Sequence, residues 1–178
     1  MAIRQITTDA EIDRQLEEAV AVAKRFWVQR LSVVGEKCVN KARSLPGPNL
    51  AVFWDSEKGQ PKRNIPKHTP GYIDWTANLR SSIGYVVVMD GQIMDMSSFE
   101  PVKGKSGDGK EGSKSGKEFA RSFASKFPND IALIVVAGMA YADYVQRDGY
   151  DVTASAELLA EELLAKLGVN PKIQHFKQ

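Results

Sequence analysis

The chain has 178 residues, of which 43% are hydrophobic and 26% are charged, and this ordinary globular composition excludes wholesale disorder and a fibrous repeat. A chain of this length builds one well-buried core, so we predict a single domain over residues 1–178. The net charge of +2 is too small to indicate a nucleic-acid-binding surface over the whole protein, and any such role has to depend on a local basic patch.

The cysteine count and the lengths of the apolar stretches indicate the cellular compartment in which the chain is made. Cys38 is the only cysteine, so an intramolecular disulfide is excluded, and a free thiol is typical of a reducing compartment. Charged residues are scattered through residues 1–13, which leaves no apolar stretch for a signal peptide. The longest nearly apolar run, residues 131–142, is about half of what a membrane-spanning helix needs. We expect cytoplasmic synthesis and no membrane partner.

A long helix is predicted at the N-terminus. Apolar residues recur at steps of three and four from Ile12 to Cys38, with Asp9 as the cap and Pro46 as the stop, which gives roughly 30 residues of helix. We expect the apolar face of this helix to pack over a sheet through Leu16, Val20, Ala23, Trp27 and Leu31.

Residues 45–71 contain five prolines with basic residues between them, and this pattern predicts an extended, basic connector. The apolar stretch 50–54 inside it is either a short strand or a plug against the core, and both interpretations stay open.

A β-hairpin follows one or two helical turns within residues 72–83. Residues 84–89 form the first strand, Asp90-Gly91 supplies the positive φ angles of a two-residue turn, and residues 92–99 form the second strand. Both faces of the hairpin carry apolar residues, so we expect both to be covered, one by the long helix and the other by a neighbour.

Residues 101–117 change character, with five glycines and five lysines. Such a stretch buries too little apolar surface to order itself, so a long flexible basic loop is predicted. Its lysines are Lys103, Lys105, Lys110, Lys114 and Lys117.

The rest of the chain completes the fold. A short helix carries Phe119, Phe123 and Phe127 at spacings of four, and residues 131–136 are predicted as a strand buried on both faces. A sharp turn over 139–150 precedes a last helix, capped by Thr153 or Ser155, that runs to Gly168, with a polar tail over 169–178. The predicted class is α+β: a long N-terminal helix packed on a small antiparallel sheet, with a short helix and a C-terminal helix.

The sequence contains stretches that resemble cofactor-binding or metal-binding motifs, but the residues around them do not fit such sites. The G-x-G-x-x-G at 107–112 does not join a strand to a helix, and the stretch 112–118 is one residue short of a phosphate-binding loop and has Glu118 where serine or threonine belongs. Neither His68 nor His175 has a second ligand at metal-binding spacing. We therefore predict no catalytic, cofactor-binding or metal-binding residue, and no enzyme activity or small-molecule substrate.

Two segments, residues 69–84 (TPGYIDWTANLRSSIG) and 135–149 (VVAGMAYADYVQRDG), resemble a family of tailed-bacteriophage proteins described as tail components or head-tail joining proteins. That family has a T-G-x-L-R-x-S-I stretch before a strand and a Y-A-x-Y-V-E-x-G stretch near the C-terminal helix. Here Ala77 stands where the family usually has glycine, and Gln146 where it has glutamate. The resemblance implies a small virion subunit of the neck or tail that assembles into a ring, without cofactor or catalytic residues.

The functional expectation is therefore a head-tail connector or tail-completion subunit that contacts copies of itself, neighbouring neck and tail proteins, and DNA in the channel. The candidate interface residues are Trp75, Arg80, Tyr141, Tyr144 and Tyr150, because exposed aromatic residues at loop edges are typical interface anchors.

Two other functions stay open. One is a nucleic-acid-binding module that uses the basic connector 58–68 and the lysines of 103–117. The other is an enzyme whose site is assembled around Asp74, Arg80 and Asp143.

Overall fold

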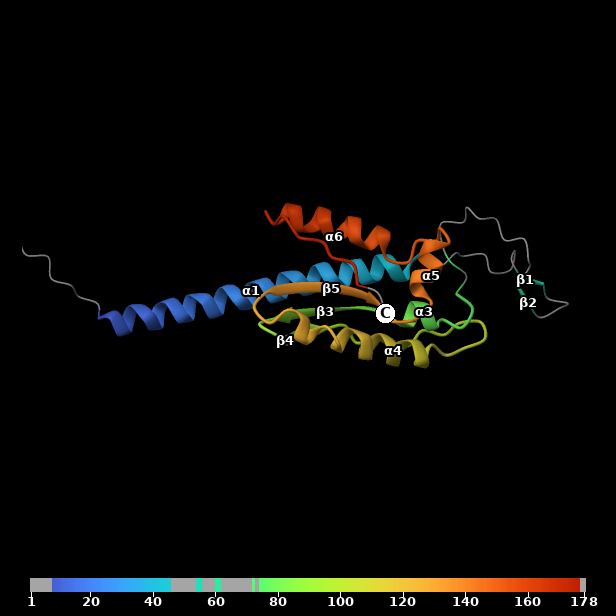
Figure 1. The fold of residues 1–178 in the computed structure, drawn as a ribbon, viewed down its shortest axis with the longest axis horizontal. Coiled ribbons are helices and arrows are strands. Elements are labelled where there is room, and N and C mark those ends of the chain that lie inside the picture. Colours follow the sequence, from blue (N-terminus) through green and yellow to red (C-terminus); the bar gives the residue numbers. More distant parts are fainter. Residues whose placement is uncertain (1–7, 46–53, 56–59, 62–71, 73, 177–178) are drawn as a thin grey trace, which may run out of the picture.

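The first element of the computed structural model is helix α1 (Asp9–Arg43), which is 35 residues long (Figure 1). The structure describes residues 8–45, 54–55, 60–61, 72 and 74–176. The cap is Thr8 and not Asp9: Thr8 has extended backbone angles, and its hydroxyl accepts a hydrogen bond from the backbone N–H of Glu11 at 3.3 Å. Asp9 is the first helical residue, where its negative charge interacts favourably with the positive end of the helix dipole.

Only the C-terminal half of α1 is packed. Leu31 is buried as predicted and Trp27 is half-buried, but Leu16, Val20 and Ala23 are exposed, so the prediction that they pack over the sheet is wrong. The reason is length: the seven-residue strands span about 23 Å, whereas α1 is about 52 Å long. The first half of α1 therefore extends past the end of the sheet, as Figure 1 shows.

The sheet has three antiparallel strands in the order β4-β3-β5. These are β3 (Ile83–Met89), β4 (Gln92–Met96) and β5 (Ile131–Ala137). Asp90 and Gly91 join β3 to β4 with φ angles of 50° and 76°, which confirms the predicted two-residue turn. The α+β class is also confirmed.

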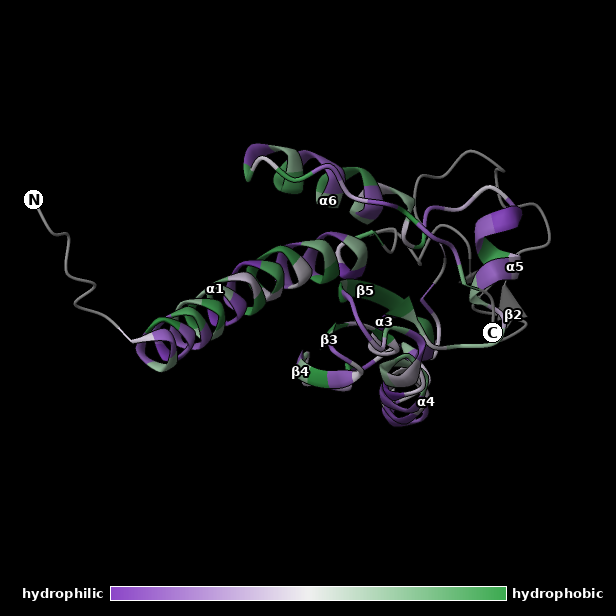
Figure 2. Cartoon of the chain, turned by 60° about the vertical axis from the view of Figure 1, so that its left-hand side comes forward, coloured by the Kyte–Doolittle hydropathy of each residue, from purple (hydrophilic) through white to green (hydrophobic). Residues whose placement is uncertain are grey.

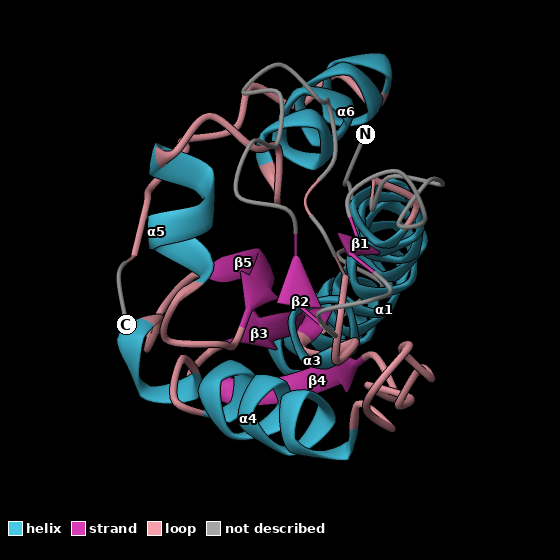
Figure 3. Cartoon of the chain, turned by 90° about the vertical axis from the view of Figure 1, so that its right-hand side faces the viewer, coloured by secondary structure: helices cyan, strands magenta, loops and turns pink. Residues whose placement is uncertain are grey.

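Both faces of β3 are covered by this chain itself. Tyr85 and Val87 face a cluster with α1, while Val86 and Val88 face a second cluster beneath α4 (Lys110–Arg121) and η1 (Ala124–Lys126). Figure 3 shows the sheet lying between α4 and α1. The expectation that both faces are covered is therefore confirmed for β3, and the neighbour on the second face is α4 of the same chain. Strand β5 is less buried than predicted, because residues 131, 132, 133, 135 and 137 keep part of their surface exposed.

Helix α4 corrects the prediction of a flexible loop over 101–117. The helix begins at Lys110, so Lys110, Lys114 and Lys117 are helical, and only Lys103 and Lys105 remain in a loop. Gly112 and Gly116 are buried, and a Cβ on Gly112 would lie 1.9 Å from the backbone oxygen of Asn78 in α3 (Asn78–Ser81). The absence of side chains lets two backbones lie in contact, a form of packing that a count of apolar residues does not register.

The remaining helices follow β5 in the chain, and the last of them lies beside α1 (Figure 1). The predicted turn over 139–150 contains a helix, α5 (Ala142–Arg147), and α6 (Ala154–Lys166) packs against α1. Thr153 is the N-cap of α6, but its side chain makes no capping hydrogen bond; the carboxylate of Asp151 accepts one from the backbone N–H of Ser155.

Two short strands, β1 (Trp54–Asp55) and β2 (Gln60–Pro61), pair with each other. The rest of the apolar stretch 50–54 and most of the basic connector 58–68 lie outside the described residues. Among the helices that the structure describes, none combines the length and the apolar character needed to cross a membrane.

Candidate functional site

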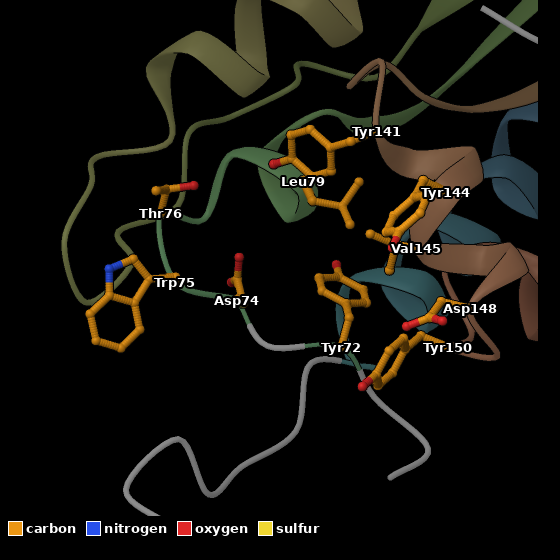
Figure 4. A pocket seen from close by; sticks show the side chains of 10 residues that line it. All are labelled: Tyr72, Asp74, Trp75, Thr76, Leu79, Tyr141, Tyr144, Val145, Asp148 and Tyr150. Atoms are coloured by element: carbon orange, nitrogen blue, oxygen red, sulfur yellow. The ribbon is translucent and has the colours of Figure 1, made fainter. Parts of the chain in front are cut away.

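An aromatic pocket of about 280 Å³ lies between α3 and α5, at the end of the molecule opposite the free half of α1 (Figures 1 and 4). Half of its lining residues are aromatic, and we refer to these ten residues as the aromatic pocket. They are Tyr72, Asp74, Trp75, Thr76, Leu79, Tyr141, Tyr144, Val145, Asp148 and Tyr150.

Backbone geometry positions both walls of this pocket. Ala77 has a left-handed conformation (φ 60°) that turns the chain from Trp75 and Thr76 into α3. This is the position where the resembled family usually has glycine, the residue that adopts such a φ without strain. On the other wall, the backbone N–H of Gly138 donates to the carbonyl of Ser82 at 3.1 Å, which ties the end of β5 to α3 just before α5 begins.

A buried ion pair supports the floor of the pocket. Asp74 is only 7% exposed, and its Oδ2 lies 2.8 Å from Nε of Arg80, although neither atom makes an aligned hydrogen bond within the described residues. Burial raises the pKa of Asp74, while the charge of Arg80 and the backbone N–H of Ala77 oppose that rise. The pair brings an acid and a base together without adding net charge to the pocket.

The hydroxyl of Tyr72 is a buried polar group of the site that has neither a hydrogen bond nor an ion pair within the described residues. Tyr72 is 3% exposed, and its hydroxyl has no hydrogen-bond partner within the described part of the chain. Burial raises the pKa of this phenol, and the nearby charge of Asp74 raises it further. In Figure 4 the Tyr72 hydroxyl and the Asp74 carboxylate both point into the space between the aromatic rings. A buried hydroxyl without a partner costs about 1–3 kcal/mol, so an incoming hydrogen-bonding group gains by meeting it.

The structure brings together all five interface candidates named from the sequence. Four of them line the pocket: Trp75, Tyr141, Tyr144 and Tyr150. The fifth, Arg80, forms an ion pair with Asp74, which is also a lining residue. Tyr144 is 67% exposed and Tyr141 41%, so these two rings form the accessible rim.

Sequence reasoning missed Tyr72, although it lies only three residues before Trp75 in the same motif. Its burial depends on the tertiary placement of α5, for which the sequence carries no local signal. The lysines of the expected loop lie in two different places. Nζ of Lys105 lies 5.3 Å from the ring centre of Trp75. Three others, Lys110, Lys114 and Lys117, lie on α4 and do not line the pocket.

The grouping expected for an enzyme does not form as predicted. Asp143 pairs with Arg147 at 2.8 Å on α5 and is not part of the pocket lining with Asp74. Over the described ranges, no cluster of three or more histidine, cysteine or acidic residues is placed to hold a metal ion. His175 is exposed and lies 3.4 Å from Glu157, and His68 is outside the described residues. Cys38 is fully buried, and burial raises the pKa of its thiol to about 11.

A larger groove of about 1000 Å³ follows β5, α6 and the C-terminal residues up to Phe176. No side-chain nitrogen or oxygen in its lining is both buried and without a hydrogen-bond partner in the described structure. The aromatic pocket, with Tyr72 and Asp74 directed into it, is therefore the better candidate for a specific contact.

Comparison of this chain with protein-family models, with curated proteins and with solved structures finds no match.

Proposed function

We propose that this chain is a structural subunit of a tailed-bacteriophage particle, a neck or tail connector that assembles into a ring. The supporting observation is that two segments far apart in the sequence line the same pocket. The two segments that carry the family resemblance, 69–84 and 135–149, supply nine of the ten lining residues of the aromatic pocket between them, and Tyr150 directly follows the second segment. Segments so far apart in sequence thus build one partly exposed surface, which is how an assembly contact is expected to look.

A ring needs head-to-tail contact between two unlike surfaces of each subunit. The aromatic pocket is the first surface. The second surface is the edge of the hairpin at 86–94, and within it β4 alone, because Val86 lies in the central strand β3 and is buried. Within the described structure β4 pairs only with β3, and it exposes 37% of Ile93 and 47% of Met94. An open strand edge of this kind is suited to burial against a neighbour.

The pocket offers the features of an interface anchor. Tyr141 and Tyr144 present large, partly exposed rings around a cavity whose floor holds the Tyr72 hydroxyl, which has no hydrogen-bond partner among the described residues. A side chain from the adjoining subunit that fills the cavity and bonds this hydroxyl satisfies a buried polar group and buries aromatic surface in one contact.

The test replaces Tyr141 and Tyr144 by alanine and measures how efficiently the purified protein joins phage heads to tails. We expect joining to fall by at least about tenfold, as for the loss of an interface hot spot. Leu158→Ala is the matched control, because Leu158 on α6 is also 67% exposed and lies outside the pocket. Normal joining by a folded Tyr141→Ala/Tyr144→Ala protein contradicts the proposed interface.

One observation favours nucleic-acid binding as a second candidate function. Lys110, Lys114, Lys117 and Arg121 follow one another at steps of four, three and four, so they share one face of α4. A basic stripe of this kind contacts phosphates without reading sequence. This role is compatible with DNA passing through a connector ring.

Retention on DNA at increasing salt concentration tests this second function. If α4 contacts phosphates, Lys114→Gln lowers the slope of log affinity against log salt by about one unit. Lys166→Gln on α6 is the control, and a protein that is not retained at low salt excludes the DNA-binding role.

A further inference from the structure

The free half of α1, residues 9–26, is here called the arm. Every residue of the arm is exposed, and Figures 1 and 2 show it leaving the body of the molecule as a single helix. With a rise of 1.5 Å per residue, the arm is about 27 Å long. It nevertheless carries large apolar side chains at helical spacing: Ile12, Leu16, Val20 and Phe26 are 48%, 61%, 46% and 47% exposed. An apolar stripe on an isolated helix is the mark of a surface that is buried on association.

Charge is distributed unevenly along the arm. Its first ten residues carry five acids and one base, Arg14, whereas residues 19–35 carry Lys24, Arg25 and Arg30 and no acid. The acids are Asp9, Glu11, Asp13, Glu17 and Glu18. Each arm therefore has an acidic half and a basic half on either side of Val20.

We propose that the arms of two copies of this chain pair antiparallel, crossing near Val20. In this arrangement the acidic half of each arm lies opposite Lys24 and Arg25 of the other, whereas a parallel pair sets acids beside acids. Leu16 of one copy then meets Ala23 of the other, a large side chain against a small one. The contact is two-fold symmetric, with the same patch used by both copies.

The arm is helical before any partner arrives, because it continues the packed half of α1. Nζ of Lys24 lies 2.5 Å from the carboxylate of Asp90 at the tip of the β3–β4 turn, and because both side chains are about half exposed, this ion pair restrains the base of the arm only weakly. Trp27 is half-buried directly after it. A preordered helix loses less conformational entropy on association than a loose segment. The pairing uses neither the aromatic pocket nor the β4 edge, so it stands independently of the connector role.

Charge reversal tests the antiparallel register. Two proteins are made, one with Glu17→Lys/Glu18→Lys and one with Lys24→Glu/Arg25→Glu, and their association is measured by sedimentation velocity. Each alone dimerises at least about tenfold more weakly than the parent chain, because like charges then face one another. An equimolar mixture of the two recovers the dimer, because the introduced lysines of one protein then face the introduced glutamates of the other, and the unchanged Lys24 and Arg25 face the unchanged Glu17 and Glu18. A parent chain that is monomeric, or a mixture that does not recover, overturns the proposal.

Single thiols test the crossing point. Cys38 is fully buried, so the parent chain gives the background of disulfide cross-linking. Val20→Cys cross-links to its own copy under mild oxidation, and Ile12→Cys does not, because antiparallel pairing places the two copies of residue 12 about 24 Å apart. Circular dichroism confirms that both variants are folded. Equal cross-linking at both positions indicates parallel pairing, and absence of cross-linking at both indicates no pairing; either result overturns the proposal.

Discussion

The arm of α1 and the first turns of α4 both show that apolar content alone does not determine burial. The arm is rich in apolar residues and wholly exposed, whereas residues 109–116 are glycines, serines and charged residues and yet include the buried Gly109, Gly112 and Gly116. Whether a residue is buried therefore depends on whether another element lies close enough to cover it. The sheet ends before the arm does, while glycine lets α4 lie directly on the backbone of α3 and on Gly138.

The largest expected effect separates the two halves of α1. Leu31→Ala should lower the free energy of unfolding by about 3 kcal/mol, because it opens a cavity beneath the sheet. Leu16→Ala in the arm, the same substitution in the same helix, should change it by less than about 0.5 kcal/mol. Urea denaturation of both variants, at concentrations where the chain is monomeric, checks this. Equal losses would show that the arm is packed in solution.

A second substitution tests the close packing of α4. Alanine normally stabilises a helix interior over glycine by about 1 kcal/mol, but Gly112→Ala should destabilise the protein by about 2 kcal/mol. Its Cβ would meet the backbone oxygen of Asn78, and backbone cannot move aside as a flexible side chain can. Thermal unfolding shows directly whether Gly112→Ala raises or lowers the stability, and Lys114→Ala on the exposed face of α4 serves as the control. A stabilised Gly112→Ala protein would mean that α3 and α4 are not in contact.

The sequence therefore predicts most of the fold and a useful part of the site. The hairpin with its Asp90-Gly91 turn, the strand near 131–136 and the long helix are encoded locally, by turn chemistry and by the spacing of apolar residues. Four of the five interface candidates, the aromatic ones, line one pocket, and the fifth, Arg80, pairs with Asp74 of that pocket. The buried Tyr72 hydroxyl and the cover supplied by α4 depend on tertiary contacts that no local pattern records.

Alkaline pH sharpens the contrast between the buried and free halves of α1. Burial raises the pKa of Cys38 from 9.0 to about 11, so between these values the unfolded chain has released a proton that the folded chain still holds. Stability should therefore fall as pH rises through this range. Cys38→Ala should flatten the fall, whereas Tyr72 and Tyr85, whose pKa values burial also raises, continue to contribute. Denaturation at several pH values measures this, and an unchanged slope in Cys38→Ala would show that the thiol is solvated.

The smallest expected effect concerns the turn that precedes α3. Ala77→Gly should raise the free energy of unfolding by about 0.5 kcal/mol, because glycine adopts a φ of 60° without strain. The gain is small because the buried methyl group of Ala77 is lost as well. Calorimetry compares the two proteins, with Ala10→Gly in the exposed arm as a control expected to lose stability. A loss in Ala77→Gly similar to that of the control would show that the turn carries no strain.

Electron cryomicroscopy of purified phage particles tests the connector role most directly. The account predicts a ring of copies of this chain at the neck or tail, with Tyr141 and Tyr144 of each copy buried against the next. Absence of the chain from the particles, or its presence with both tyrosines facing solvent, would contradict the account.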